Sequence, residues 1–222
     1  MFIGHFALAF AARRAAPTVP LSVGFAACQL ADLAWPLFVL AGLEQVEVAP
    51  GDTAVTPLRF VSYPWSHSLL ALAAWATAAA LAWWLLRRRD SRGALVIAAL
   101  VLSHWLLDFL SHRADMPLVP GDTARYGLGL WNSVAATFVV ELAMLSVGLW
   151  LYVRTMKARS TAANLILAGL VAVMLVVYVA AAFGAPPPDA HAVALTALGM
   201  WLFVAWAHWA DRRRVLRDHG HG

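Results

Sequence analysis

Residues 102–113 read LSHWLLDFLSHR, and this stretch decides how the rest of the chain is interpreted. It ends an apolar run that begins near Gly93, and it places His104, Asp108 and His112 four residues apart. On a helix these three side chains share one face. The run is long enough to cross a bilayer, where each ionisable side chain costs roughly 2.5–3.5 kcal/mol. Three such side chains together therefore favour a functional site with partners, a metal ion or a wet cavity.

The composition is that of a membrane protein. Of the 222 residues, 62% are hydrophobic and only 13% are charged, and the mean hydropathy is +0.72. Apolar runs repeatedly reach the roughly 20 residues that a helix needs to span the hydrocarbon core. A soluble domain of this length would need a charged surface that is missing here. Because no alternating barrel pattern is present, we expect an all-α, polytopic membrane bundle with about six or seven spanning helices.

Charge and cysteine content narrow the class of protein further. The formal net charge is +4, but the arginines fall in short clusters between apolar segments. Such clusters are typical of topology determinants, so we expect a lipid bilayer and no nucleic acid as partner. The single cysteine, Cys28, excludes an intrachain disulfide framework.

Seven apolar segments follow one another along the chain. We expect them at residues 1–12, 17–43, 67–86, 93–112, 128–154, 162–183 and 190–210. The first is too short to span comfortably. Its arginines follow the apolar stretch, which argues against a secretory signal peptide and keeps His5 in the mature structure. Pro36 is expected to kink the second segment.

The connections predict the orientation of the bundle. Residues 44–66 and 113–127 are rich in Gly and Pro and too long for simple turns, so we expect an ordered cap on one face. The other connections are basic, with clusters at residues 13–14, 87–92, 154–159 and 212–217. If each helix from the second onward spans once, these clusters share one side. The positive-inside rule makes that side cytoplasmic, together with the C-terminus.

The chain divides by the distribution of its ionisable residues. We expect residues 1–154 to form a metal-site membrane domain and residues 155–222 to add a C-terminal helical pair with a basic tail, within the same compact bundle. Ionisable residues inside apolar segments are concentrated before Ser146. The tail, residues 212–222 with His219 and His221, is expected to fray.

Candidate metal ligands lie in several apolar segments. A single His–Asp pair four residues apart is as often a hydrogen-bonded pair that joins helices, and single buried His or Glu residues usually serve packing or capping. Together, however, these residues supply the imidazole and carboxylate ligands that suit Zn²⁺ or a similar divalent ion. Buried carboxylates without a cation would repel one another. We therefore predict a metal site formed by His5, Asp32, His67, His104 and Asp108, with His112 and Glu141 as outer members.

Hydrolysis is the reaction that this residue set supplies most directly. A divalent metal activates water and polarises a phosphoryl or acyl oxygen. A carboxylate not engaged as a ligand, Asp32 or Asp108, could act as general base. No G-x-S-x-G motif surrounds Ser66, Ser103 or Ser111, so we expect no serine nucleophile. Because the predicted site lies in the outer half of the bilayer, we expect a lipid or lipid-linked (phospho)ester that enters from the membrane.

Four short motifs carry a family resemblance. They are GHF at residues 4–6, QLADLAWP at 29–36, SYPWSHSL at 62–69 and SHWLLDF at 103–109. They resemble the YdjM-like group, described as inner-membrane, metal-dependent hydrolases under LexA control. The resemblance covers roughly the first 150 residues and implies a bacterial inner membrane.

A second likeness concerns the order of the ligand types. An early His, an Asp, a His, His-x-x-x-Asp and a later Glu are similar to the pattern of zinc-dependent phospholipase C and related nucleases. This would imply a helical site for up to three zinc ions that cleaves phosphate esters. This chain departs from that pattern because it has no second clear His-x-x-x-Glu.

Two other functions use the same residues. Transporters also place carboxylates and histidines at mid-membrane, so a permease that relays protons or binds a substrate is one alternative. A convincing internal repeat would favour it, and we find none. A membrane scaffold with buried hydrogen-bonded pairs is the other alternative, and it predicts no metal.

Overall fold

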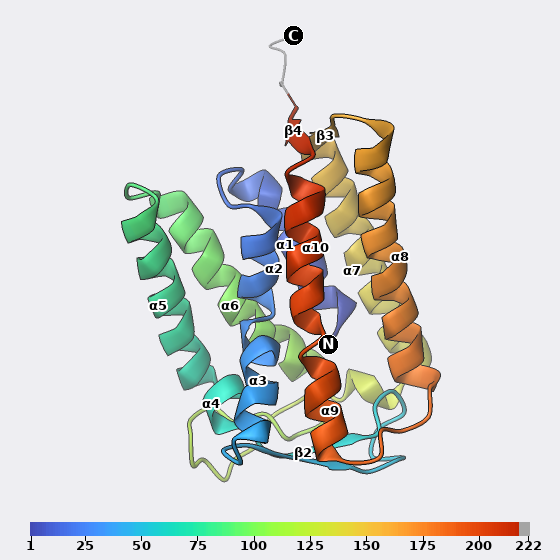
Figure 1. The fold of residues 1–222 in the computed structure, drawn as a ribbon. Coiled ribbons are helices and arrows are strands. Elements are labelled where there is room, and N and C mark those ends of the chain that lie inside the picture. Colours follow the sequence, from blue (N-terminus) through green and yellow to red (C-terminus); the bar gives the residue numbers. More distant parts are fainter. Residues whose placement is uncertain (218–222) are drawn as a thin grey trace.

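The computed structural model describes residues 1–217, which fold into a helical bundle with small strands at both ends (Figure 1). The helices are α1 (Ile3–Ala15), α2 (Leu21–Cys28), α3 (Leu30–Leu40), α4 (Pro64–His67), α5 (Leu69–Leu86), α6 (Ser91–Ser111), α7 (Val134–Thr155), α8 (Thr161–Phe183), α9 (Ala190–Ala197) and α10 (Met200–Asp211). The 3-10 turn η1 is Leu130–Asn132, and the strands are β1 (Gln45–Val48), β2 (Leu58–Ser62), β3 (Met156–Ala158) and β4 (Arg214–Leu216).

Helices α5, α6, α7 and α8 and the α9–α10 segment are long and apolar enough to cross a membrane. The bent pair α2–α3 gives a sixth candidate span. Only 17% of the apolar window of α5 and 44% of that of α6 is buried inside the protein. The remaining apolar surface faces outward, which is the arrangement expected of helices surrounded by lipid. The prediction of an all-α, polytopic membrane bundle is confirmed.

Helix α1 is enclosed by the other helices. It has 13 residues, too few to span, and it packs against α7, α2 and α6. Its backbone touches that of α7, because a Cβ atom at Gly148 would collide with the carbonyl of Ala7. Close approach of this kind is what small residues permit between membrane helices. The contact fixes α1, and with it the fully buried His5, in the centre of the bundle.

The second apolar segment bends at a place that the sequence did not predict. Helices α2 and α3 meet at Gln29 at an angle of 54°, whereas Pro36 lies inside α3. The sequence did not predict this bend at Gln29. Tertiary packing explains the position of the bend, since α2 packs against α1, α6 and α10 but α3 packs against α9 and α4.

Two other predicted segments are shorter or interrupted. The fifth begins at Val134 instead of residue 128, because Ser133 caps α7 by accepting a hydrogen bond from the N–H of Ala136. The seventh is divided into α9 and α10, with Leu198 and Gly199 between them. There the N–H groups of residues 201 and 202 bond to carbonyls three residues back, which tightens the chain locally.

The two long loops form an ordered cap, as predicted. Strands β1 and β2 pair antiparallel, and residues 113–127 close on themselves through a bridge between Met116 and Tyr126. The loops are tied together because the Arg113 guanidinium donates to Asp52 at 2.9 Å. The backbone of α5 joins them, since the N–H of Leu69 bonds to the carbonyl of Pro117.

The opposite end of the bundle gathers the basic clusters (Figure 1). Strand β3 pairs antiparallel with β4, Arg13 lies 3.3 Å from Asp211, and the Thr18 hydroxyl donates to Asp90. The tail is thus ordered through Arg217, and the expectation of fraying from residue 212 is wrong for this part. The predicted frayed residues His219 and His221 lie outside the described residues.

The C-terminal helices pack directly on the N-terminal half. Helix α10 contacts α2 and α8, and α9 contacts α3. Residues 155–217 therefore share one bundle with residues 1–154.

Candidate metal centre

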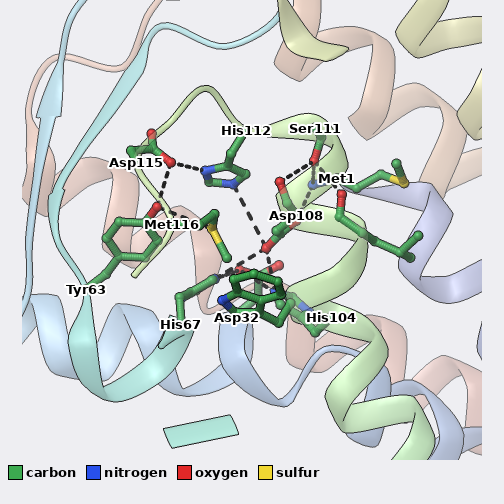
Figure 2. Close-up of polar contacts among 12 residues, drawn as sticks. Met1, Asp32, Tyr63, His67, His104, Asp108, Ser111, His112, Asp115 and Met116 are labelled. Carbon is green, nitrogen blue, oxygen red and sulfur yellow. Dashed lines mark hydrogen bonds and ion pairs between the residues drawn. The ribbon is translucent and has the colours of Figure 1, made fainter. Parts of the chain in front are cut away.

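The seven candidate ligands come from five helices and the residue after one of them. Figure 2 shows five of them, Asp32, His67, His104, Asp108 and His112, together in the interior. His5 lies on α1, Asp32 on α3, His67 on α4, His104 and Asp108 on α6, and Glu141 on α7, whereas His112 directly follows α6. All are buried except Asp32, whose side chain is 23% exposed.

Asp108 lies at the centre of the cluster. Its Oδ2 atom is 3.0 Å from His104 Nε2, 3.8 Å from His67 Nε2 and 3.9 Å from His112 Nε2. Its Oδ1 atom is 3.1 Å from His5 Nε2 and 2.6 Å from the amino nitrogen of Met1. The i, i+4 spacing in α6 thus brings His104 and Asp108 together as the sequence predicts.

His112 reaches the cluster by another route than the predicted one. It is the C-cap of α6 with extended backbone, φ −67° and ψ 152°, so it does not continue the helical face of His104 and Asp108. The chain turns away here, and the N–H of Gly129 bonds to the His112 carbonyl. Its ring packs against Trp131 and Phe60, at centroid distances of 4.3 and 4.9 Å.

The bend between α2 and α3 brings Asp32 to the cluster. Asp32 is in the first turn of α3, and its Oδ1 atom lies 3.3 Å from His67 Nε2 and 3.7 Å from His104 Nε2. Two groups of three residues have ligand atoms within 4.8 Å of one another and could hold a metal ion. They are His5, His104 and Asp108, and Asp32, His67 and His104.

Three imidazoles are oriented through their Nδ1 atoms. His104 Nδ1 lies 2.8 Å from the Cys28 carbonyl and His112 Nδ1 lies 3.0 Å from Asp115 Oδ1. Both partners accept, so Nδ1 carries the proton and the Nε2 lone pair is directed at the carboxylates. Cys28 is the last residue of α2, so the helix break supplies the carbonyl that orients His104.

His67 is oriented by a chain of two hydrogen bonds that begins in the cap. The Ser66 hydroxyl donates to Glu44 Oε2 at 2.6 Å and lies 2.6 Å from His67 Nδ1. Since its one proton is directed at Glu44, Ser66 accepts from the imidazole. Glu44 is 2% exposed, and its Oε1 atom accepts the N–H groups of Trp65 and Ser66. Sequence reasoning missed this carboxylate.

Asp115 is a second carboxylate that the sequence did not indicate. Burial alone would raise the pKa of Asp115, but hydrogen bonds from His112 and Tyr63 and the nearby Arg113 hold it below its ordinary value. Burial and the Asp115 charge raise the pKa of Tyr63 well above its ordinary value. The phenol therefore stays protonated, and Asp115 stays an acceptor for His112.

Glu141 contacts the backbone of α1 instead of either group of three. Its Oε2 atom accepts the N–H groups of Phe2 and Gly4, at 2.9 and 3.0 Å. Such a carboxylate satisfies donors that a helix N-terminus leaves unpaired. Its Oε1 atom is buried and has no hydrogen-bond partner among the described residues.

The donor atoms fit a small divalent ion. The Nε2 atoms of His67 and His104 each lie near both Asp32 Oδ1 and Asp108 Oδ2. The four N–O distances range from 3.0 to 3.8 Å. Ligands about 2.1 Å from a tetrahedral zinc ion lie about 3.4 Å apart. Within residues 1–217, the buried Nε2 of His104 lacks a hydrogen-bond partner of acceptable geometry. A cation would satisfy this nitrogen and compensate the buried carboxylates.

A cavity of about 210 Å³ lies beside the cluster. Asp32, His67, Asp108, His112 and Glu141 supply its polar wall. Apolar walls come from Phe60 of the cap, from Trp131 of η1, and from the C-terminal helices, which supply Ala181, Ala197 and Met200. The candidate ligands therefore face a space that a reacting group could enter.

Comparisons of the chain with protein-family models, with curated proteins and with solved structures returned no match. The functional argument consequently rests on the geometry of the bundle and its buried cluster.

Proposed function

We propose that this chain is a metal-dependent hydrolase embedded in a bacterial inner membrane, where it cleaves a lipid or lipid-linked (phospho)ester. The observation that supports it is the convergence of His67, His104, Asp32 and Asp108, with N–O distances of 3.0 to 3.8 Å, beside a cavity within apolar helices. The motifs that resemble the YdjM-like group supply the same residues, and we propose membership of that group on this basis.

The proposed site holds one zinc ion. His104 Nε2 belongs to both groups of three ligands, and an imidazole nitrogen has a single lone pair. His104, His67 and Asp108 would hold the ion, a set that combines members of both groups, since the Nε2 atoms of His104 and His67 lie 3.0 and 3.8 Å from Asp108 Oδ2. Zinc in such a ligand set acts as a Lewis acid toward a phosphoryl or acyl oxygen and activates water.

Asp32 is the proposed general base. Both carboxylates line the cavity, but Asp108 is enclosed by His5, His104 and Met1 and its side chain is 3% exposed, whereas the side chain of Asp32 is 23% exposed. A base must reach the proton that it abstracts, which favours the more exposed carboxylate. The Asp32 carboxylate would hold the proton taken from water.

The test is a search for products. The full chain in liposomes is incubated with a total lipid extract, with and without chelator, and the lipids are analysed by mass spectrometry. We expect one lipid class to be depleted by wild type only when metal is present. Asp32→Asn should retain metal and lose about 10²–10⁴-fold in rate, as expected for loss of a general base. Asp122→Asn in the cap is the control, because the Asp122 side chain accepts from the Ala124 N–H and does not line the cavity beside the cluster. If no lipid changes in a chelator-sensitive and Asp32-dependent manner, the hydrolase proposal fails.

One observation favours a permease as the second candidate. Both halves of the chain contain an interrupted membrane segment, at Gln29 and at Leu198–Gly199, and the affected helices α3 and α9 pack together. Transporters build substrate sites from such broken helices. Uptake of a radiolabelled divalent metal into liposomes that contain the protein, without lipid cleavage, would support this candidate.

A further inference from the structure

A second and larger cavity lies between α8 and the α9–α10 segment, with a volume of about 1150 Å³. Its walls are apolar, with Val177 and Ala181 from α8 and Phe203 and Trp206 from α10. No charged side chain of residues 1–217 lines it. In the hydrocarbon region of a bilayer, a groove with these walls suits a hydrocarbon chain and no polar solute.

The groove adjoins the cavity at the candidate metal centre. Residues that line both include Phe2, Trp35, Ala181, Ala197 and Met200. The smaller cavity has the polar wall and about 210 Å³, and the larger groove has about five times that volume. A polar compartment joined to a larger apolar one matches the two parts of an amphipathic molecule.

The walls of the groove are set by how α8 and α10 meet. The Trp206 indole N–H donates to the Ile166 carbonyl at 3.1 Å, and the same ring packs over Gly169. This contact joins the two helices toward the end with the basic clusters. Toward the cap the helices separate, as Figure 1 shows for α8 and α9, and the residues between the contact and the cap line the groove.

We propose that this groove binds the hydrocarbon tail of the substrate while its ester group occupies the cavity at the metal centre. The inference rests on the proposed hydrolase function and adds the position and chemistry of the tail site. The occupant is an acyl or isoprenoid chain of a membrane lipid. The wall residues that this groove shares with the cavity at the candidate metal centre distinguish it from the apolar helix faces that ordinary bilayer lipid covers.

The test measures lipid contact without requiring turnover. The probe is a phosphatidylethanolamine with a diazirine near the end of one acyl chain, photolysed with the full chain in nanodiscs after chelator treatment. We expect saturable labelling of Val177, Ala181 and Phe203 that unlabelled lipid competes. Labelling of the outward face of α5, where Leu85 and Leu86 are 70% and 80% exposed, should not saturate.

Ala181 lines both cavities, so Ala181→Trp places a large side chain where they meet. Val179→Trp is the matched control. Val179 is on the same helix, is 46% exposed and lines neither cavity. Displacing two or more buried methylenes should weaken saturable labelling about tenfold in Ala181→Trp. The control should label like wild type.

The outcomes separate this inference from the proposed function. Unsaturable labelling that is equal on α5 and in the groove, and unaffected by Ala181→Trp, would overturn the tail site even if the protein hydrolyses lipid. Saturable groove labelling that Ala181→Trp removes would support it, even if no lipid is cleaved and the hydrolase proposal fails.

Discussion

The orientation of single histidines decides whether the cluster can bind a metal. His67, His104 and His112 each place Nδ1 on a fixed partner, which leaves Nε2 for the carboxylates or a cation. Partners in this position normally set ligand tautomer and basicity. Glu44 acts on His67 through two hydrogen bonds, by way of the Ser66 hydroxyl, and is thus a positioning residue.

The first prediction follows from this chain of hydrogen bonds. In Glu44→Gln, the amide NH₂ donates to Ser66, so the Ser66 hydroxyl is free to donate to His67 Nδ1 and places the imidazole proton on Nε2. We expect metal affinity to fall about 10–100-fold. Competition with a chromophoric chelator measures the metal affinity of each variant. Glu47→Gln is the matched control, because Glu47 lies in the same hairpin and its side chain is 60% exposed. Equal affinities of both variants and wild type would refute the role of Glu44.

At the scale of elements, the enclosed helix α1 depends on one glycine of α7. A side chain at Gly148 would collide with the backbone of Ala7, so Gly148→Val must push α1 and α7 apart. Overpacking of this kind costs about 1–3 kcal/mol, and it moves His5 and Glu141 relative to α6. We expect a lower unfolding temperature in detergent together with weaker metal binding. Val147→Leu is the control, because Val147 is 57% exposed, and it should change neither the unfolding temperature nor the metal affinity. Normal stability and metal affinity in Gly148→Val would contradict the close contact.

The turn between α5 and α6 gives a prediction about pH. Hydrogen bonds from the Gly93 N–H and the Thr18 hydroxyl lower the pKa of Asp90 below its ordinary value. Because the folded pKa is depressed, the charged carboxylate stabilises the fold above the unfolded value of about 3.9, and this contribution is lost as pH falls through the folded pKa. Asp90→Asn should therefore unfold at a lower temperature than wild type near neutral pH. The difference should shrink on acidification below pH 4, and a difference independent of pH would contradict the assignment.

The sequence predicts the helices better than their interruptions. Hydropathy locates every long helix, because each must present about 20 apolar residues to lipid. It does not locate the bend at Gln29 or the division after Ala197, since these depend on how α2, α3 and α9 pack against other helices.

For the whole molecule, the candidate site was predictable where ionisable residues stand out against apolar sequence. His5, Asp32, His104 and Asp108 are conspicuous in this way, and the structure brings them together. Glu44 and Asp115 lie in polar loops, where an acidic residue is ordinary. Their burial depends on how the cap folds over the bundle, which the sequence pattern does not indicate. The two cavities depend on α8, α9 and α10, which carry no candidate ligand, so no sequence pattern indicated them.

The central claim is that the buried cluster binds a divalent metal, and elemental analysis of the purified chain without a polyhistidine tag tests it most directly. The protein is loaded with excess Zn²⁺, freed of unbound metal and compared with His104→Ala and Asp108→Ala. His208→Ala is the control, because His208 is exposed at the opposite end of the bundle. Since both ligand groups share His104, we predict about one zinc ion per chain in wild type and the control, and none in the two cluster variants. Wild type without stoichiometric metal, or folded cluster variants that retain it, would contradict the account.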